Sequence, residues 1–469
     1  MSSTRALAGY LSRLKYENLP ADVVEKGKLS LINSLGNSIG GYPLTVSKTF
    51  LELSKDLGIG RPESTLIGDG TKVSVSGAAF GNGGLSTMLD HSDYFRSESG
   101  RCWIWPGALA VPAALAAGEA QGISGKELIV SAVAGYECSA RILTGMDMTL
   151  ETTKQINGET ISTFAAAGAA GRAFGLDEDE MLSTLGMAGT YTVVPGWYKW
   201  VSDEGLSPRK DIKQGWAFMC MAGAFAAVSA KRGLRMVQEN NILDGQKGLS
   251  RMLSMDSYNE ERVTEGFGET FHIREFASKF YPGGAVAHPP IVGVRDMIDE
   301  HGFSPEDIDT IEVGTAIQDG VGFDDPDPHN LSEMQFSLPY MLAAALFSGT
   351  PGGPDWFVDA TANDPRVTRL SKRVTMTFDD ECQTFFNATN LRLSKVTVTT
   401  KSGQQYYKRV EHNGEAKTPE EIRDKFIGAA SQVIERKQVD EILDTIGDLE
   451  TVSNISKLTG LLAPFPAKG

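Results

Sequence analysis

Two segments dominated by alanine and glycine place the strongest constraint on how this chain folds. Residues 164–174 read FAAAGAAGRAF, and residues 221–231 read MAGAFAAVSAK. Small side chains let helix axes approach one another closely, and alanine favours the helical conformation. We therefore expect both segments to be central helices of a tight bundle, with buried packing as their main role.

Helix start signals recur through roughly the first 270 residues. Ser124-Gly-Lys-Glu127 precedes a long apolar run and has the form of a capping box. Asp177-Glu-Asp-Glu180 opens the following helical run in the same way. This part of the chain is therefore predicted to be helical.

The pattern changes near residue 274. A helix-like stretch containing Ile291 to His301 is followed by Ser304-Pro-Glu-Asp, which caps a short turn. Residues 310–315, 373–378 and 395–400 then alternate β-branched and polar side chains, as strands do. Ser402-Gly403 follows the last of these and predicts a hairpin.

Helix resumes at Thr418-Pro-Glu-Glu421, with threonine as N-cap and proline at the first helical position. A chain of 469 residues exceeds one compact core. We expect a mostly α fold with an α+β part: a large all-helical domain built from residues 1–273 and 417–469, and an inserted smaller α+β domain, the lid, at 274–416. A cleft between two such domains is a common place for a small-molecule site.

Charge, cysteine content and hydropathy restrict the class of protein. The formal net charge is −16, which argues against nucleic acid or an anionic membrane as partner. The longest apolar run, residues 108–117, is far shorter than the roughly 20 residues of a membrane helix. No N-terminal signal is evident, and the four cysteines are widely separated. We expect a soluble, cytoplasmic protein with reduced thiols.

The common nucleotide and hydrolase motifs are absent from the sequence. It contains no P-loop, no HExxH, no GxSxG elbow and no GxGxxG fingerprint after a strand. The acidic loop 324–329 offers oxygen ligands and one imidazole, but lacks the ligand spacing and the glycine of an EF-hand loop. We interpret it as a solvated, proline-stiffened loop, and we expect neither a metal nor an organic cofactor.

The lid contributes the first pair of candidate catalytic residues. Lys279 lies where the α+β part begins, and His288 follows a glycine-rich stretch and precedes Pro289-Pro290, on a rigid turn. A lysine facing a cleft binds a carboxylate or, when desolvated, acts as a general base. A histidine nearby supplies a second proton-transfer group near neutral pH.

Two further clusters lie in the predicted helical part. Arg209, Lys210 and Lys213 precede a helix start, where cations are unfavourable, so they either face an anion or form a solvated basic loop. Asp90 and His91 follow the glycine-rich residues 77–84, and they either act as an acid and base or form a capped helix end. Both alternatives stay open for each cluster.

Taken together, five segments resemble the MmgE/PrpD family, which contains 2-methylcitrate dehydratases, cis-aconitate decarboxylase and iminodisuccinate epimerase. They are GAAFGNGGLSTMLDHSD (77–93), WPGALAVPAALAAGEAQGISGKELIVSAVAGYE (105–137), STFAAAGAAGRAFGLDEDEMLSTLGMAG (162–189), KFYPGGAVAHPPI (279–291) and MQFSLPYMLAAAL (334–346). The resemblance spans almost the whole chain. It implies a helical domain from both chain ends, an α+β lid, a homodimer, and no metal or organic cofactor.

The resemblance carries five site residues to this sequence: Asp90, Lys210, Lys279, His288 and Tyr340. It also shows departures from the family pattern. Trp105 stands where the family usually reads histidine, a second family histidine falls near Ile156, and Tyr94 replaces a threonine. These changes imply a more apolar and aromatic pocket, in which Trp105 and Tyr94 contact the substrate together with Arg209 and Lys213.

The reaction implied by the family is removal of a proton, or of carbon dioxide, next to a carboxylate. Nearby cations must stabilise the resulting enolate-like carbanion, a role for Lys210 and Lys279. His288 or Lys279 would act as base, and Tyr340 or His91 would return a proton. We therefore expect a cofactor-independent lyase of dehydratase type acting on a small di- or tricarboxylate. An epimerase of an iminodisuccinate-like substrate, and a catalytically silent scaffold of the same fold, are the two alternatives.

Overall fold

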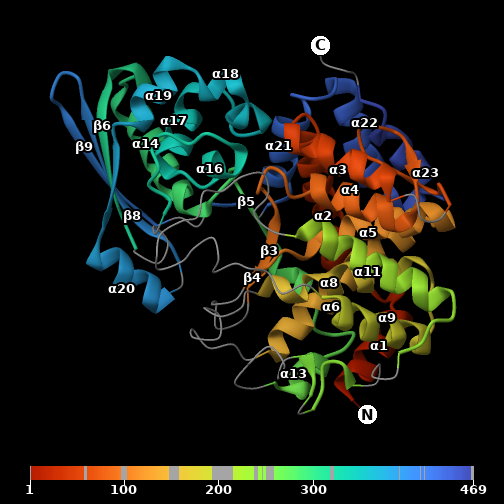
Figure 1. The fold of residues 1–469 in the computed structure, drawn as a ribbon. Helices are drawn as coiled ribbons and strands as arrows, with labels where there is room; N and C mark the ends of the chain where they lie inside the picture. The colour runs from red at the N-terminus through yellow and green to blue at the C-terminus, as the bar shows by residue number, and fades with distance from the viewer. Residues whose placement is uncertain are drawn as a thin grey trace.

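The computed structural model describes residues 2–57, 61–96, 103–146, 158–192, 215–236, 241–245, 247–249, 258–316, 322–389, 391–411, 414–416 and 418–465. Within these ranges the fold is mostly helical with small sheets, as predicted (Figure 1). No helix in the described ranges is long and apolar enough to cross a membrane.

The helices that precede residue 274 pack together with those at the C-terminus of the chain (Figure 1). The N-terminal helices are α1 (Ser3–Arg13), α2 (Ala21–Gly41), α3 (Thr45–Asp56), α4 (Val75–Leu85), α5 (Pro106–Gln121), α6 (Gly125–Gly145), α8 (Ser162–Ala173), α9 (Glu178–Tyr191), α11 (Trp216–Lys231) and α13 (Glu260–Thr264). The C-terminal helices are α21 (Pro419–Ala430), α22 (Arg436–Gly447) and α23 (Ser456–Thr459). The two ends of the chain therefore contribute to one helical body.

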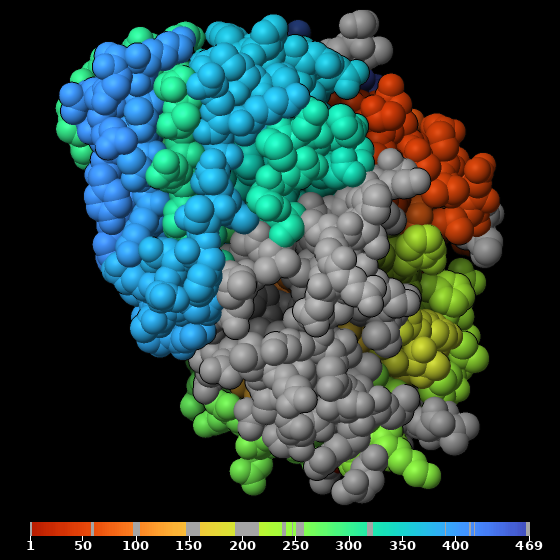
Figure 2. Space-filling model, turned by 60° about the vertical axis from the view of Figure 1, so that its left-hand side comes forward, coloured from red at the N-terminus to blue at the C-terminus, as the bar shows by residue number. Residues whose placement is uncertain are grey.

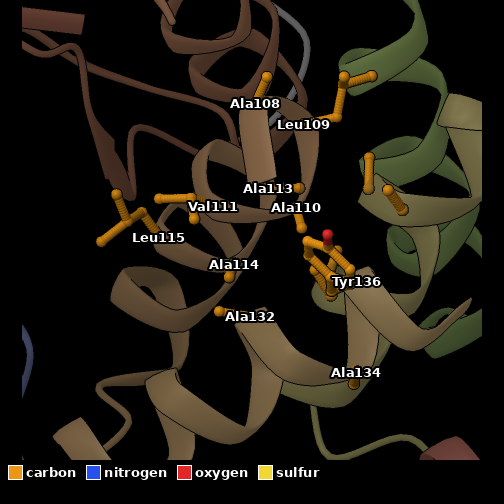
Figure 3. Close-up of a cluster of buried hydrophobic side chains, with 14 of the residues drawn as sticks. Ala108, Leu109, Ala110, Val111, Ala113, Ala114, Leu115, Ala132, Ala134 and Tyr136 are labelled. Atoms are coloured by element: carbon orange, nitrogen blue, oxygen red, sulfur yellow. The ribbon is translucent and has the colours of Figure 1, made fainter. Parts of the chain in front are cut away.

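Small side chains allow the close packing at the centre of this body, as the sequence predicts. Almost every residue of α8 is buried, and α8 packs against α5, α6 and α11. Figure 3 shows Ala110 of α5 beside the ring of Tyr136 on α6. The capping boxes at Ser124 and Asp177 are confirmed. Helix α11 is central on one face only, because Phe218 and Phe225 on its other face are exposed.

The prediction of an all-helical part was wrong in one respect. Its described residues include four short strands: β1 (Ser64–Thr65), β2 (Lys72–Val73), β3 (Asp93–Arg96) and β4 (Trp103–Ile104). Strands of two to four residues are too short to show an alternating pattern, so the sequence gives no periodic signal for them.

The described residues between 280 and 414 form a second body (Figures 1 and 2), and this body has its own sheet (Figure 1). Its sheet has the order β7-β6-β8-β9, where β6 (Ile308–Thr315) is parallel to β7 (Val374–Phe378) and antiparallel to β8 (Leu393–Thr400). The predicted hairpin joins β8 to β9 (Gln405–Glu411). The helices of this body are α14 (His288–His301), α16 (Leu331–Gln335), α17 (Leu338–Phe347), α18 (Asp359–Ala362), α19 (Pro365–Ser371) and α20 (Asp380–Thr389).

A small antiparallel sheet, called the seam sheet below, joins the two bodies. Its strand order is β10-β5-β3-β4, with β5 (Ala277–Lys279) between β3 and β10 (Glu415–Ala416). Strand β5 carries the chain into the second body and β10 carries it back. Just beyond both strands, the amide of Phe280 donates to the carbonyl of Gly414 at 2.6 Å.

Buried hydrophobic residues form two large clusters that correspond roughly to these bodies. One cluster draws on residues 7–277 and 416–465. The other draws mainly on residues 281–398, with a few members from the helical body, such as Leu89 and Ala429. We propose that they mark two domains; the boundaries at 273/274 and 416/417 stay a prediction.

Candidate active site

A buried ion pair between the two bodies forms the centre of the candidate site. The ammonium of Lys279, at the end of β5, donates to Oδ2 of Asp90 at 2.7 Å, to the Asp90 carbonyl at 3.0 Å and to the Gly283 carbonyl at 3.1 Å. The two side chains are only 8% and 4% exposed. In such a low-dielectric setting each charge depends on the other for stability.

Asp90 is held in an unusual backbone conformation. Its φ of +47° makes it the one non-glycine residue with positive φ among those that the structure describes. Aspartate tolerates this region better than most residues, although it still costs free energy. The turn after α4 imposes the conformation, since the Asp90 amide donates to the Thr87 carbonyl at 3.0 Å.

The glycine-rich segment after Lys279 clamps the loop that carries Asp90. The Gly283 amide donates to the Leu89 carbonyl at 3.0 Å, and the Gly284 amide donates to the Gln335 carbonyl at 2.7 Å. The Gln335 side chain in turn donates to the Met88 carbonyl at 2.5 Å. Gly283 has a φ of +83° and a Cβ there would meet the Gln335 carbonyl at 2.9 Å, so only glycine fits.

Two buried imidazoles each contact a backbone carbonyl next to the seam sheet. His91 Nε2 lies 2.9 Å from the carbonyl of Phe280, and His288 Nδ1 lies 3.3 Å from the carbonyl of Gly414. A carbonyl accepts only, so these two nitrogens carry the hydrogens in the neutral rings and the opposite nitrogens hold lone pairs. The hydrogen bond between Phe280 and Gly414 thus links both rings.

Burial controls the protonation of His91. It lowers the pKa of His91 well below its ordinary value, and the positive charge of Lys425 lowers it further. His91 is therefore neutral at physiological pH. Its Nδ1 has no hydrogen-bond partner among the described residues. His288 was expected on a rigid turn; the structure places it, fully buried, as the first residue of α14.

A polar face on α2, absent from the sequence-based prediction, lies next to these groups. Its members are spaced i, i+3, i+4 and i+7 and are almost fully buried: Ser30, Asn33, Ser34 and Asn37. Asn37 donates to the His91 carbonyl at 3.1 Å, and Lys425 of α21 donates to Asn33 Oδ1 at 2.6 Å. The helical spacing of the four polar residues was the signal that could have revealed this face.

Asp93 anchors the start of α5 rather than the ion pair. Its Oδ2 accepts a hydrogen bond from the Gly107 amide at 2.9 Å, at the helix N-terminus, where a carboxylate is favoured. Burial raises the pKa of Asp93 to about 6. Trp105, the N-cap residue of α5, is buried and packs against Trp216, with ring centroids 5.3 Å apart.

The two candidate tyrosines occupy different surroundings. Tyr94 is buried on β3, and the Arg96 guanidinium lies 5.6 Å from its ring centroid. Tyr340 is in the second body, where its hydroxyl donates to the Trp356 carbonyl at 2.6 Å. Burial raises the pKa of Tyr340 well above its usual value. Proton donation by Tyr340 to a substrate would require that this hydrogen bond be exchanged.

Three predicted site residues lie outside the described ranges: Arg209, Lys210 and Lys213. Ile156, near which the second family histidine would fall, lies outside them too. The acidic loop 324–329 is described and its acidic side chains are exposed; Asp327 pairs with Lys372 at 3.2 Å. Among the described residues there is no group of three or more His, Cys, Asp or Glu side chains arranged to hold a metal ion.

The fold and the site together define the class of protein. It is mostly helical, and a buried lysine–carboxylate pair lies between a helical body and an α+β body. The chain belongs to the MmgE/PrpD family: the MmgE/PrpD N-terminal domain matches residues 5–261, and the MmgE/PrpD C-terminal domain matches residues 281–450.

Cis-aconitate decarboxylases from several organisms are similar to this chain over nearly its whole length. Cis-aconitate decarboxylase of Aspergillus terreus is 24% identical, over 98% of this chain and 95% of its own length. The mouse enzyme of the same name is 23% identical, over 98% and 93%. The human one is 22% identical, over 99% and 95%. The chain is thus similar to these enzymes from end to end at low identity.

Proposed function

We propose that this protein is a cofactor-independent lyase that removes a proton, or carbon dioxide, next to a carboxylate of a small di- or tricarboxylic acid. The observation that carries the proposal is the buried Asp90–Lys279 pair, 2.7 Å apart, at the boundary between the two bodies. Family membership and full-length similarity to cis-aconitate decarboxylases support it. A lysine cation placed there favours an enolate-like intermediate.

In the mechanism, Lys279 stabilises negative charge and an imidazole moves the proton. The Lys279 ammonium donates to two oxygens of Asp90 and to the Gly283 carbonyl, and a substrate carboxylate would replace at least one of these acceptors. His288 is the preferred base, because the carbonyl of Gly414 fixes its ring through Nδ1, so that Nε2 is the nitrogen that would take the proton. Lys210, Arg209 and Lys213 would add positive charge.

Return of the proton requires a second group. His91 or Tyr340 fills this role in the proposal: the Tyr340 hydroxyl carries a hydrogen to donate, whereas neutral His91 would first take up a proton at Nδ1. His91 lies nearer the ion pair, since it directly follows Asp90 in the chain and its imidazole contacts the Phe280 carbonyl. Trp105 and Tyr94 stand where the family usually has histidine and threonine. We therefore expect that the part of the substrate that contacts these two side chains carries fewer charges.

Epimerisation is the second candidate, and one observation favours it. Two-base epimerases need one group that takes the α-proton and an opposed group that already carries a proton. His91 and His288 each have one nitrogen fixed by a backbone carbonyl, and in this alternative neutral His91 would take the proton while a protonated His288 delivers one. A substrate of the iminodisuccinate kind would exchange its α-proton between them. In a catalytically silent scaffold, the third alternative, substitution of either histidine would change no turnover.

The test follows solvent deuterium by NMR during incubation with cis-aconitate, 2-methylcitrate and iminodisuccinate in deuterated water. Loss of carbon dioxide or formation of an alkene identifies a lyase, whereas exchange with inversion and no alkene identifies an epimerase. His288→Gln should abolish the reaction. His301→Gln, at the exposed end of the same helix α14, is the matched control and should leave it unchanged.

If the wild-type protein shows neither exchange nor product with any of these acids, the enzyme proposal fails and the scaffold alternative gains support. We also propose a homodimer located in the cytoplasm, as the family resemblance implies. Light scattering coupled to size exclusion would report a dimer mass, and a monomer mass would contradict this part.

A further inference from the structure

Lys425, on α21, is a partly buried cation that the proposed mechanism does not use. Its ammonium donates to Asn33 Oδ1 at 2.6 Å, to Ser278 Oγ at 2.5 Å and to the carbonyl of His91. The Ser278 hydroxyl also donates to Asn33 Oδ1 at 2.7 Å, which closes a triangle of polar groups. An ammonium has three hydrogens, so all the donors of Lys425 are used within the protein.

The three acceptors belong to three different segments of the chain. Asn33 is on α2, and Ser278 is on β5, directly before Lys279. His91 directly follows Asp90. Lys425 therefore ties together the residues adjacent to both members of the ion pair, from a helix that contributes nothing to the pair itself.

The charge of Lys425 acts on the same neighbourhood. Burial lowers the pKa of Lys425 well below its ordinary value, Asp93 opposes this shift, and the positive charge of Lys279 adds to it. The same cation lowers the pKa of His91. Three titratable groups therefore surround the Lys425 ammonium: His91 from the loop after Asp90, Asp93 from β3 and Lys279 from β5.

We propose that Lys425 is a positioning residue that fixes the loop of Asp90 against the strand of Lys279, and so sets the geometry of their ion pair. Because its donors are saturated, it does not contact the substrate. Its kinetic consequence rests on the proposed function, whereas its effect on the environment of Lys279 does not. A lysine that merely filled space would be replaced by methionine with little consequence.

The kinetic test compares Lys425→Met with Arg423→Met, which removes an exposed cation two residues earlier on the same helix. For Lys425→Met we expect kcat to fall by about tenfold or more while KM changes by less than about threefold, because misplacement of a catalytic group affects the transition state most. Arg423→Met should match the wild type. Equal kcat in all three proteins would overturn the proposal.

The second test needs no substrate. Brief reaction with an acetylating reagent, followed by peptide mass spectrometry, compares labelling of Lys279 with that of Lys437, which is 85% exposed. In Lys425→Met we expect Lys279 to label at least about threefold faster relative to Lys437, because its segment opens more often. Unchanged labelling would overturn the proposal.

Ser278→Ala covers the case in which Lys425→Met does not fold. It removes one contact of the ammonium and keeps the charge, so a smaller rise in Lys279 labelling is expected, and no rise counts against the proposal. If labelling rises but the wild type acts on no carboxylate, Lys425 still positions the pair and only the proposed function has failed.

Discussion

Lys279 donates to both the carbonyl and the carboxylate of Asp90, so one side chain fixes the backbone and the charge of the same residue. The backbone of Asp90 has positive φ, and its side chain is buried. The same lysine therefore stabilises both the backbone conformation and the buried charge of Asp90, and a substitution of either residue removes both effects together.

Asp90→Asn should lower both activity and stability. Asparagine tolerates positive φ, so the substitution removes the charge and adds little backbone strain. The Lys279 cation stays buried without its counter-ion, and we expect a loss of about 3 kcal/mol in the free energy of unfolding. Denaturant unfolding measures it. Asp440→Asn, which breaks the exposed pair with Arg436, should cost less than about 1 kcal/mol. Equal losses in the two variants would refute the buried pair.

Gly414→Ala should disturb His288. Gly414 has a φ of +67°, and a Cβ there would collide with the His288 ring. Gly403→Ala is the matched control, because Gly403 has a φ of +86° with nothing within 4 Å of its Cβ position. Both variants lose about 1–2 kcal/mol from backbone strain, and Gly414→Ala should lose about 1–3 kcal/mol more from the collision. Thermal unfolding of the two variants, side by side, checks the difference.

Gly107→Ala should displace Asp93 from the N-terminus of α5. The added Cβ would lie 2.7 Å from Asp93 Oδ1 and 2.5 Å from Ser30 Oγ. We expect a loss of about 1–3 kcal/mol from this overpacking. Gly447→Ala, with nothing within 4 Å of its Cβ position, should be close to neutral. The prediction fails if the two alanine variants unfold at the same denaturant concentration.

Asp93→Asn should gain stability relative to the wild type as pH rises. Burial raises the pKa of Asp93 from 3.8 to about 6, so the folded state holds its proton more tightly than the unfolded chain. The contribution of Asp93 to stability is therefore full below about pH 4 and falls until about pH 6. Asparagine does not titrate, so the stability difference should rise by up to about 3 kcal/mol between pH 4 and pH 7.

Unfolding titrations of both proteins across this pH range measure that difference. Asp364→Asn is the control with the opposite sign, because Arg366 lowers the pKa of Asp364 and so favours its ionised form in the folded state. A pH-independent difference for Asp93→Asn would show that its carboxyl group titrates normally.

The parts of the fold with local signals were predictable from sequence. The capping box at Ser124 and the hairpin after residue 400 depend on neighbouring residues, whose chemistry can be read directly. The strands β3 and β5 were missed because they are stabilised by partners far away in the chain. Their pairing is a tertiary event that a sequence of three or four residues does not encode.

The candidate site was predictable to the extent that it resembles a known family. Asp90, His91 and Lys279 were named in advance, and the structure brings them together. Lys425 was missed because it lies in an amphipathic helix rich in charged residues, where one more lysine reads as a surface residue. The signal for Lys425 is indirect. The polar face on α2 is buried and needs polar partners, so it indicates that some polar side chain packs against it.

The adjacency of Phe280 and Gly414 has a consequence for how this architecture can change. The chain between these two residues is one long insertion, and its two ends are joined by the hydrogen bond between Phe280 and Gly414. Such an insertion behaves as a cassette: it can be shortened, exchanged or transplanted without rethreading the rest of the chain. Insertions and deletions can therefore accumulate within the cassette while the helical body that receives it keeps its own connections.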